Sequence, residues 1–140
     1  MPFWVPIAIA AIAAAVAICL FLLGDRPQHA MLKAEASAKF RSAFFAESIA
    51  DLDNKDAYAL MHQARTQHDA AIIEFRPFVH PNQIKHFDVA EQKFHRCRSE
   101  LQPKPLKILA AIRSNKPVDH SDTDELKEAL TRLLAFADKT

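Results

Sequence analysis

One stretch near the start of the chain constrains its fold more than any other feature. Residues 3–23 read FWVPIAIAAIAAAVAICLFLL, and every charged residue of the protein lies after them. As an α-helix, a run of this length spans roughly 30 Å, which matches the hydrocarbon core of a bilayer. The sequence therefore predicts a transmembrane helix over residues 3–23, within an anchor of residues 1–26 that precedes a soluble helical domain of residues 27–140.

The same stretch lacks the features of a cleaved signal peptide. No Lys or Arg precedes it, its apolar run is longer than a signal core, and no A-x-A triplet stands at its end. A lipoprotein signal that ends at Cys19 would need a small residue where Ile18 stands. We interpret residues 3–23 as a retained anchor in contact with membrane lipid.

Flanking charge predicts the orientation of this anchor. Four basic residues follow the apolar run closely: Arg26, Lys33, Lys39 and Arg41. Because Lys and Arg are enriched on the cytoplasmic flanks of membrane helices, we expect the C-terminal domain in the cytoplasm. An exported domain, as in a bacteriophage-type envelope protein, would require the opposite orientation and stays open as an alternative.

Alanines within the anchor recur at small-xxx-small spacing, in the pairs Ala10/Ala14, Ala11/Ala15 and Ala13/Ala17. Small residues at this spacing let two membrane helices approach closely, so the alanine-rich anchor could support a homo-oligomer. The alternative is a single helix whose alanines face lipid.

Glycine usage limits the classes of function. Gly24 is the only glycine, so residues 27–140 contain none. Phosphate-binding loops, dinucleotide-binding turns and nucleophile elbows need glycine where a Cβ would clash, so we expect a protein that is not an enzyme and uses no cofactor. The net charge of +1 gives no argument for nucleic acid, and we expect none as a partner.

Apolar residues at helical spacing predict the first two helices of the domain. One helix is expected over residues 28–53 and a second over residues 57–75, which carry the most regular stripe of the chain. Pro77 should end or kink the second helix, because proline removes a backbone donor. The apolar positions are Phe40, Ala43, Phe44, Phe45, Ile49 and Leu52, then Ala57, Leu60, Met61, Ala64, His68, Ala71, Ile72 and Phe75.

A third helix is expected to start at residues 80–83, with Pro81 in its first turn and Gln83 as a reciprocal cap. Pro103 and Pro105 should close this helix. Its stripe consists of Ile84, Phe87, Ala90, Phe94, Cys97 and Leu101.

After a short segment of residues 106–113 and a loop of residues 115–120, the last helix opens at residues 121–125. Their sequence, SDTDE, supplies caps and acids that complement the helix dipole. Its expected buried face consists of Leu126, Ala129, Leu130, Leu133, Leu134 and Ala137. The predicted fold is therefore all-α: an N-terminal transmembrane helix followed by an antiparallel bundle of about four helices.

His68 is the one histidine within a predicted apolar stripe. It is either a neutral core histidine or a candidate pH-sensing residue, since histidine titrates near neutrality. No zinc or di-iron motif joins the seven histidines. The nearest approach, Asp88, Glu91 and His95 on one helix face, is more typical of a solvated ion-pair surface, so we predict no metal site.

The basic stretch of residues 93–116 and the pentapeptide of residues 74–78 supply the candidate partner or lipid contacts. Seven basic residues in residues 93–116 stand against one acid, and a domain tethered to a membrane could lay this surface on anionic lipid. The alternative is that this basic stretch and the acidic stretch of residues 117–128 both face solvent and partly compensate each other. The candidate contacts are Phe78, Arg76, Arg96, Arg98, Lys104 and Lys107.

Several short patterns resemble small single-pass membrane proteins of bacteria that carry a C-terminal helical domain and have no known activity. They are Phe40-x-x-x-Phe44, His68-x-Ala70-x-x-x-Glu74-Phe75-Arg76-x-Phe78, Phe87-Asp88-x-Ala90 and Leu133-Leu134-x-Phe136-Ala137. The resemblance implies a bacterial inner-membrane protein with a helical domain, and it brings no functional residue.

These observations predict a membrane-tethered, non-enzymatic helical module for interaction or scaffolding, which binds a protein partner or self-associates. The alternative is a membrane-associated regulator or sensor, which responds to pH through His68 or to anionic lipid through residues 93–116.

Overall fold

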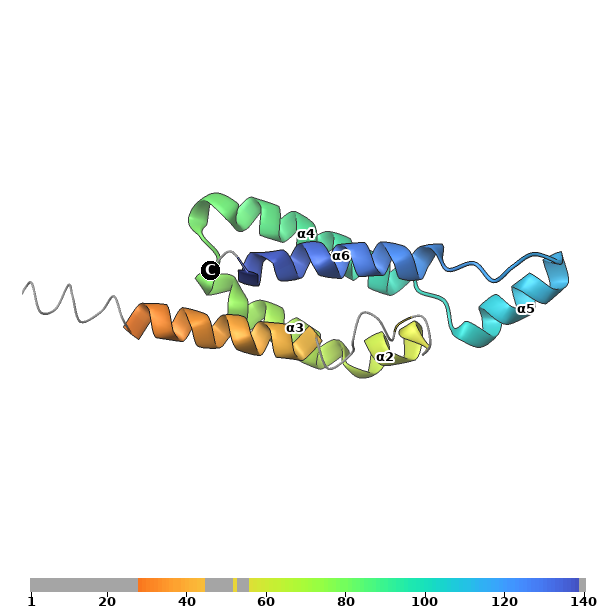
Figure 1. Cartoon of the computed structure of the whole chain (residues 1–140), viewed down its shortest axis with the longest axis horizontal. Helices are drawn as coiled ribbons and strands as arrows, with labels where there is room; N and C mark the ends of the chain where they lie inside the picture. Colours follow the sequence, from red (N-terminus) through yellow and green to blue (C-terminus); the bar gives the residue numbers. More distant parts are fainter. Residues whose placement is uncertain (1–27, 45–51, 53–55, 139–140) are drawn as a thin grey trace, which may run out of the picture. The chain divides into compact units, whose positions relative to one another are not determined.

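The computed structural model describes residues 28–44, Leu52 and residues 56–138. Within these ranges the chain forms helices joined by turns and loops, without a β-strand, which confirms the predicted all-α helical bundle (Figure 1). The predicted anchor of residues 3–23 lies outside the described residues. None of the helices within the described ranges combines the length and the hydropathy that a bilayer crossing requires.

Residues 36–140 form one compact unit. The unit begins inside a helix that covers residues 28–44. The following elements are α2 (Ala57–Gln63), α3 (Arg65–Phe75), the 3-10 turns η2 (Arg76–Phe78) and η3 (Pro81–Gln83), α4 (Ile84–Glu100), α5 (Lys104–Ser114) and α6 (Ser121–Asp138). The longer helices make the bundle that the sequence predicts, and α2 and α5 are short additions to it.

The expected helix over residues 57–75 is present as two helices, α2 and α3. Ala64 interrupts them with φ −89° and ψ 6°, outside the helical geometry. Its N–H still bonds the Leu60 carbonyl at 3.0 Å, and the His68 N–H bonds the Ala64 carbonyl at 2.9 Å, so the apolar stripe continues across the break. Neither proline nor glycine marks this position, and the spacing pattern therefore could not predict it.

Histidine, not glutamine, caps the start of the third helical segment. The His80 ring nitrogen Nδ1 accepts a hydrogen bond from the Asn82 N–H at 3.3 Å, and no side-chain cap is recorded for Gln83. The prediction of a Gln83 cap was therefore wrong in its residue, although the start at Pro81 is confirmed. The preceding helix gives way to η2 after Phe75, as Pro77 predicted.

The prolines after α4 begin a helix instead of only ending one. Pro103 is the N-cap of α5, and Pro105 lies in its first turn, where a proline costs no hydrogen bond because the first N–H groups of a helix have no partner. Asn115 ends α5 in the left-handed conformation, at φ 52° and ψ 39°, which asparagine tolerates better than most residues.

The last helix spans Ser121–Asp138 and begins where the sequence predicts it, and Asp119 caps its start. The Asp119 carboxylate accepts a hydrogen bond from the Ser121 N–H at 2.9 Å. This bond to an otherwise unpaired helical N–H also holds the pKa of Asp119 below its usual value. The capping residue is therefore Asp119, which precedes by two positions the run of residues 121–125 in which the sequence predicts the caps.

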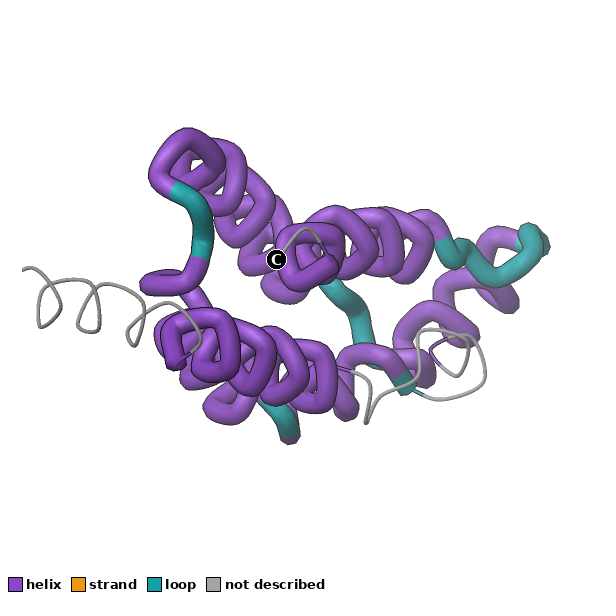
Figure 2. The backbone as a smooth tube through the Cα atoms, turned by 60° about the vertical axis from the view of Figure 1, so that its left-hand side comes forward, coloured by secondary structure: helices purple, strands orange, loops and turns teal. Residues whose placement is uncertain are grey.

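Phenylalanines fill the core of the unit. The Phe40 ring stacks on Phe75 with centroids 4.4 Å apart, and Phe44 meets Phe94 edge to face at 5.6 Å. From α2 onward, α4 and α6 share the most extensive contact, and they run antiparallel side by side (Figures 1 and 2). All six predicted apolar positions of α6 are buried, so its predicted face is confirmed.

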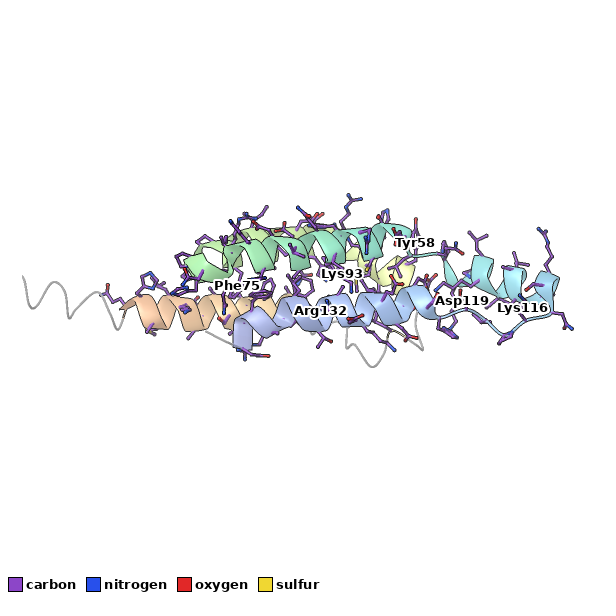
Figure 3. The ribbon with its side chains drawn as sticks, turned by 90° about the horizontal axis from the view of Figure 1, so that it is seen from above. Tyr58, Phe75, Lys93, Lys116, Asp119 and Arg132 are labelled. Carbon is purple, nitrogen blue, oxygen red and sulfur yellow. The ribbon has the colours of Figure 1, made fainter. Side chains whose placement is uncertain are left out.

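The short helix α5 stands apart from this core. It contains no buried residue, and it extends past the ends of α4 and α6 (Figures 1 and 2). Figure 3 shows Lys116 at the end of this segment that is remote from the bundle, and Asp119 where the chain returns toward α6. The segment that the sequence treats as a short connection is thus a separate helix outside the core.

Candidate functional site

Arg76 ties the end of α3 to α4 instead of facing solvent alone. Its guanidinium forms ion pairs with Asp88 at 2.7 Å and with Glu91 at 3.2 Å. Phe78, two residues later, is half-buried against the hydrophobic core. Arg76 therefore takes part in the α3–α4 connection while 46% of its side chain stays exposed, and Phe78 is partly withdrawn into the core.

Arg98 is also engaged within the bundle. It donates from Nη1 to the Asp69 carboxylate and from Nη2 to His95 Nδ1, both at 2.9 Å, and its guanidinium lies 5.2 Å from the centre of the Phe94 ring. Only 9% of its side chain is exposed. Since an arginine can only donate, His95 Nδ1 is the acceptor in this contact, and His95 Nε2 lies 3.5 Å from Glu91.

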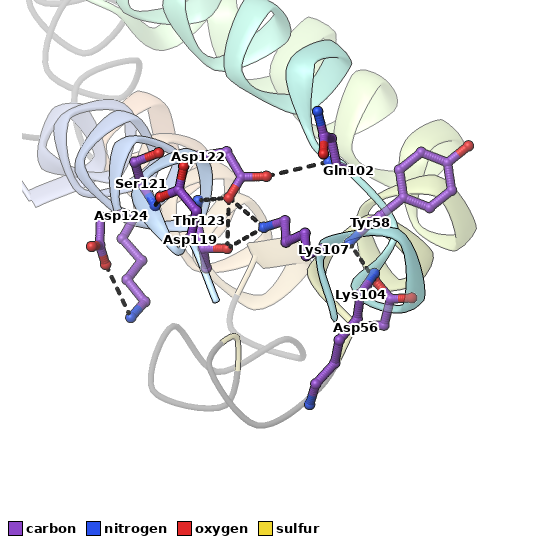
Figure 4. Close-up of polar contacts among 11 residues, drawn as sticks. Asp56, Tyr58, Gln102, Lys104, Lys107, Asp119, Ser121, Asp122, Thr123 and Asp124 are labelled. Carbon is purple, nitrogen blue, oxygen red and sulfur yellow. Dashed lines mark hydrogen bonds and ion pairs between the residues drawn. The ribbon is translucent and has the colours of Figure 1, made fainter. Parts of the chain in front are cut away.

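The other three candidate basic residues differ in their surroundings. Arg96 is exposed on α4, and Lys104 is exposed at the start of α5. Lys107, in contrast, turns toward the bundle and binds the Asp122 carboxylate (Figure 4). The structure thus distributes the six predicted contacts over η2, α4 and α5, and their ion pairs run to different helices.

Asp122 is the centre of the junction between α5 and α6. Besides Lys107, it accepts a hydrogen bond from the Gln102 N–H at 3.2 Å, as Figure 4 shows. Burial disfavours the ionised carboxylate, but the bonds from Lys107 and Gln102 outweigh that cost and lower the pKa of Asp122. This junction is the main polar attachment of α5 to the rest of the unit among the described residues.

The apolar side chains of α5 are exposed. Leu106 is 56% exposed, Ile108 41%, Leu109 61% and Ile112 73%. Isolated exposed hydrophobic residues are common on proteins, but four on one short helix form a patch of the kind that marks an interaction site. Sequence reasoning missed this patch because it assigned no helix to these residues, although the hydrophobic spacing of Leu106, Leu109 and Ile112 was available as a signal.

His68 lies at the centre of the core. Its relative exposure is 0%, and its ring stacks on Phe44 with centroids 4.6 Å apart. Burial, reinforced by the positive charge of Arg98, lowers the pKa of His68 to about 4, although Asp69 and a backbone hydrogen bond at Ala43 oppose the shift. The imidazole is therefore neutral at physiological pH and packs as an aromatic core residue.

Two surface grooves accompany these features. One, of about 510 Å³, lies over α2, α3 and α4 and presents Arg65, His62 and Tyr58 beside the Arg98–Asp69 pair. The other, of about 350 Å³, lies between α4 and α6 and includes Val89 and Phe136. The first groove joins residues far apart in the sequence, so no local pattern could predict it.

The acidic face of α4 and the Cys97 thiol are the remaining candidates for chemistry among the described residues. Within the described ranges no group of three histidine, cysteine or acidic residues is placed to hold a metal ion. Arg76 occupies the carboxylates of Asp88 and Glu91. Burial raises the pKa of the Cys97 thiol, which disfavours the nucleophilic thiolate.

Comparison with protein-family models, with curated proteins and with solved structures finds no match for this chain. Across residues 28–44 and 56–138 the structure defines an all-helical bundle in which α5 exposes its apolar side chains outside the core.

Proposed function

We propose that this protein is a membrane-tethered, non-enzymatic helical module that acts by contact, with α5 as its contact element. The predicted anchor holds the protein at the inner membrane of a bacterial cell, with the domain in the cytoplasm. The domain then presents α5 to another surface. A protein partner, a second copy and anionic lipid are the surfaces to which the sequence pointed.

The single observation that carries this proposal is the exposure of Leu106, Leu109 and Ile112 outside a bundle that buries its other apolar stripes. Exposing large aliphatic side chains to water costs free energy, about 1.5–3 kcal/mol for each one that could be fully buried instead. The described residues of the bundle bury most of their apolar side chains, so the exposed face of α5 gains free energy only when a further surface covers it.

The alternative of pH sensing at His68 has weaker support. A pKa of about 4 places its titration well below the pH of a cytoplasm. His68 therefore fits the role of a structural residue better than that of a physiological sensor.

Cysteine accessibility in membranes tests whether α5 is covered. In a chain that carries Cys19→Ala and Cys97→Ala, the variant Ile112→Cys is compared with Gln92→Cys, which lies exposed on α4. Both positions face solvent in the structure. If nothing covers α5, a water-soluble maleimide should therefore label residues 92 and 112 at equal rates in opened membrane vesicles. We expect labelling at residue 112 to be at least fivefold slower, and equal rates would refute α5 as the contact element.

A fusion of alkaline phosphatase to the C-terminus tests the orientation. The enzyme is active only after export, so we expect no activity. Activity would place the domain on the opposite side of the membrane and would support the alternative of an exported domain.

A further inference from the structure

The helix α5 is attached to the bundle through its polar face, and its apolar face is the exposed one. At 100° per residue, Leu109 lies about 160° around the helix from Lys107, and Ile112 about 140° from it. Lys107 is bound to Asp122 and Thr123 at the start of α6, with the Thr123 hydroxyl 3.4 Å from its Nζ. The charged side chain therefore faces the bundle, and the apolar face points away from it.

Basic residues flank this outward apolar face. Residues 101–118 contain Lys104, Lys107, Arg113 and Lys116 and no acidic residue. Arg113 and Lys116 are exposed at the remote end of α5, and neither takes part in a recorded ion pair within the described ranges. A surface that covers α5 therefore has to accept aliphatic side chains and positive charge together.

We propose that α5 is an interfacial helix that seats on the anionic lipid surface of the membrane to which the protein is anchored. Its chemistry is that of a helix lying in the plane of a bilayer interface: aliphatic side chains enter the boundary of the acyl chains, and Lys or Arg meets anionic headgroups. The inference rests on the proposed function, because it names the surface that α5 contacts.

A second copy of the chain fits α5 less well. Two α5 helices that pair through their apolar faces would bring basic residues together, Arg113 against Arg113 in a parallel pair and Arg113 against Lys104 in an antiparallel pair. An 11-residue helix is also only about 16 Å long, so such a pair buries far less than the roughly 1,200 Å² of a stable interface. Lipid requires no matching shape, and the charge favours an anionic surface.

The weak attachment of α5 suits this role. Within the described ranges the helix buries no residue, Lys107 contacts Asp122 and Thr123 of α6, and the Lys104 N–H lies 3.4 Å from the Asp56 carboxylate. Because the predicted anchor already holds the domain near the bilayer, a modest affinity of α5 for lipid is sufficient for occupancy.

The test uses the full chain in nanodiscs, at one copy per disc and without any other protein. In the background of Cys19→Ala and Cys97→Ala, Ile112→Cys carries an environment-sensitive dye, and Gln92→Cys carries the same dye as the matched control. We compare discs of phosphatidylcholine alone with discs that contain 30% phosphatidylglycerol, about the anionic content that gives a strong surface potential.

We expect the dye at residue 112 to shift to the blue in anionic discs and to become at least tenfold less accessible to aqueous iodide. The dye at residue 92 should not change. Arg113→Glu with Lys116→Glu should abolish the shift at residue 112, and so should raising the salt from 0.1 M to 0.5 M, at which surface charge is screened.

Three outcomes would overturn the lipid assignment. Absence of a shift in anionic discs, despite slow labelling in native membranes, would leave α5 as the contact element and make a protein its occupant. Cross-linking between copies through residue 112 in discs that hold two chains, without a lipid effect, would assign α5 to self-association. An equal shift in neutral discs would show that charge does not take part.

Discussion

The helices α5 and α6 follow one another in the chain and use similar residues in opposite ways. Both carry Leu or Ile at helical spacing, yet α6 buries seven of its residues and α5 buries none. In α6 the leucines face α4, and the acids of its first turn face solvent or the helix junction. In α5 the lysine faces the bundle and the aliphatic side chains face outward.

This difference shows what an amphipathic pattern specifies. The pattern determines that one face of a helix is apolar, and burial of that face provides the driving force for packing. It does not determine which surface covers the face. For α6 that surface is the bundle of the same chain, whereas no described residue buries the apolar face of α5.

The same contrast appears between His68 and Ile112. The bundle encloses a titratable ring with a relative exposure of 0%, while α5 leaves an isoleucine 73% exposed. Each residue departs from the usual distribution of polar and apolar side chains. The burial of His68 lowers the stability of the fold at low pH. The exposure of Ile112 leaves apolar surface in water that another surface could bury.

The largest expected effect comes from emptying the buried face of α6. Leu133→Ala removes a side chain with no exposure, so it should lower the free energy of unfolding by about 3 kcal/mol through lost transfer energy and a residual cavity. The matched change in α5 is Leu109→Ala. Chemical denaturation of the full chain, followed by circular dichroism, measures both, and losses of similar size would contradict the contrast between the helices.

Acid should destabilise the bundle through His68. Its folded pKa of about 4 lies below the ordinary value of 6.5, so the unfolded chain binds a proton first as the pH falls. Stability is therefore complete above pH 6.5 and declines between pH 6.5 and 4, by up to about 3 kcal/mol.

The variant His68→Leu should flatten this decline and keep or raise the stability at pH 7. Unfolding curves from pH 7.5 to pH 4.5 measure the slope, and His62→Leu, at an exposed position of α2, serves as the control. A slope that persists in His68→Leu, or one that disappears in His62→Leu, would assign the acid sensitivity to another group.

Loosening α5 should have a smaller effect. Lys107→Met removes the ion pair with Asp122, whose partners are both largely shielded from solvent, and should cost about 1 kcal/mol. Hydrogen exchange should increase in α5 and remain unchanged in α4. The control is Lys127→Met, because its partner Asp124 is mostly exposed and such pairs contribute little. Equal exchange in the two variants would show that Lys107 does not hold α5.

The smallest effect is expected at the outer face of α5. Ile112→Ala should change the free energy of unfolding by less than about 0.5 kcal/mol, because the side chain has little burial to lose. Ile72→Ala, at a position that is 2% exposed on α3, is the matched buried change and should cost several times more. A comparable loss at residue 112 would mean that the bundle itself covers α5.

Hydrophobic spacing predicted the core well where residues three or four apart had to share a face. Phe87, Phe94 and Leu130 were expected inside and are buried. Helix ends marked by proline were also predictable at Pro77 and Pro81. The break at Ala64 was not, because a backbone distortion without glycine or proline leaves no local signal.

The candidate contacts show the limit of the same reasoning. Charge counts grouped Arg98 and Lys107 with Arg96 as one basic surface. The fold instead engages Arg98 with Asp69, 29 positions earlier, and Lys107 with Asp122. A charge pattern records which residues are present, but the partner of each one depends on which helices become neighbours.

The sequence by itself determined that the domain is helical and which faces of its helices are apolar. It also determined that residues 3–23 are long and apolar enough to be predicted as an anchor. All of these properties depend on local composition and periodicity. Only the tertiary structure decided that the apolar face of α6 is covered and that of α5 is not. The physical reason is that burial is a relation between surfaces, and the orientation of α5 depends on the bond between Lys107 and Asp122, which forms only when the start of α6 lies beside it.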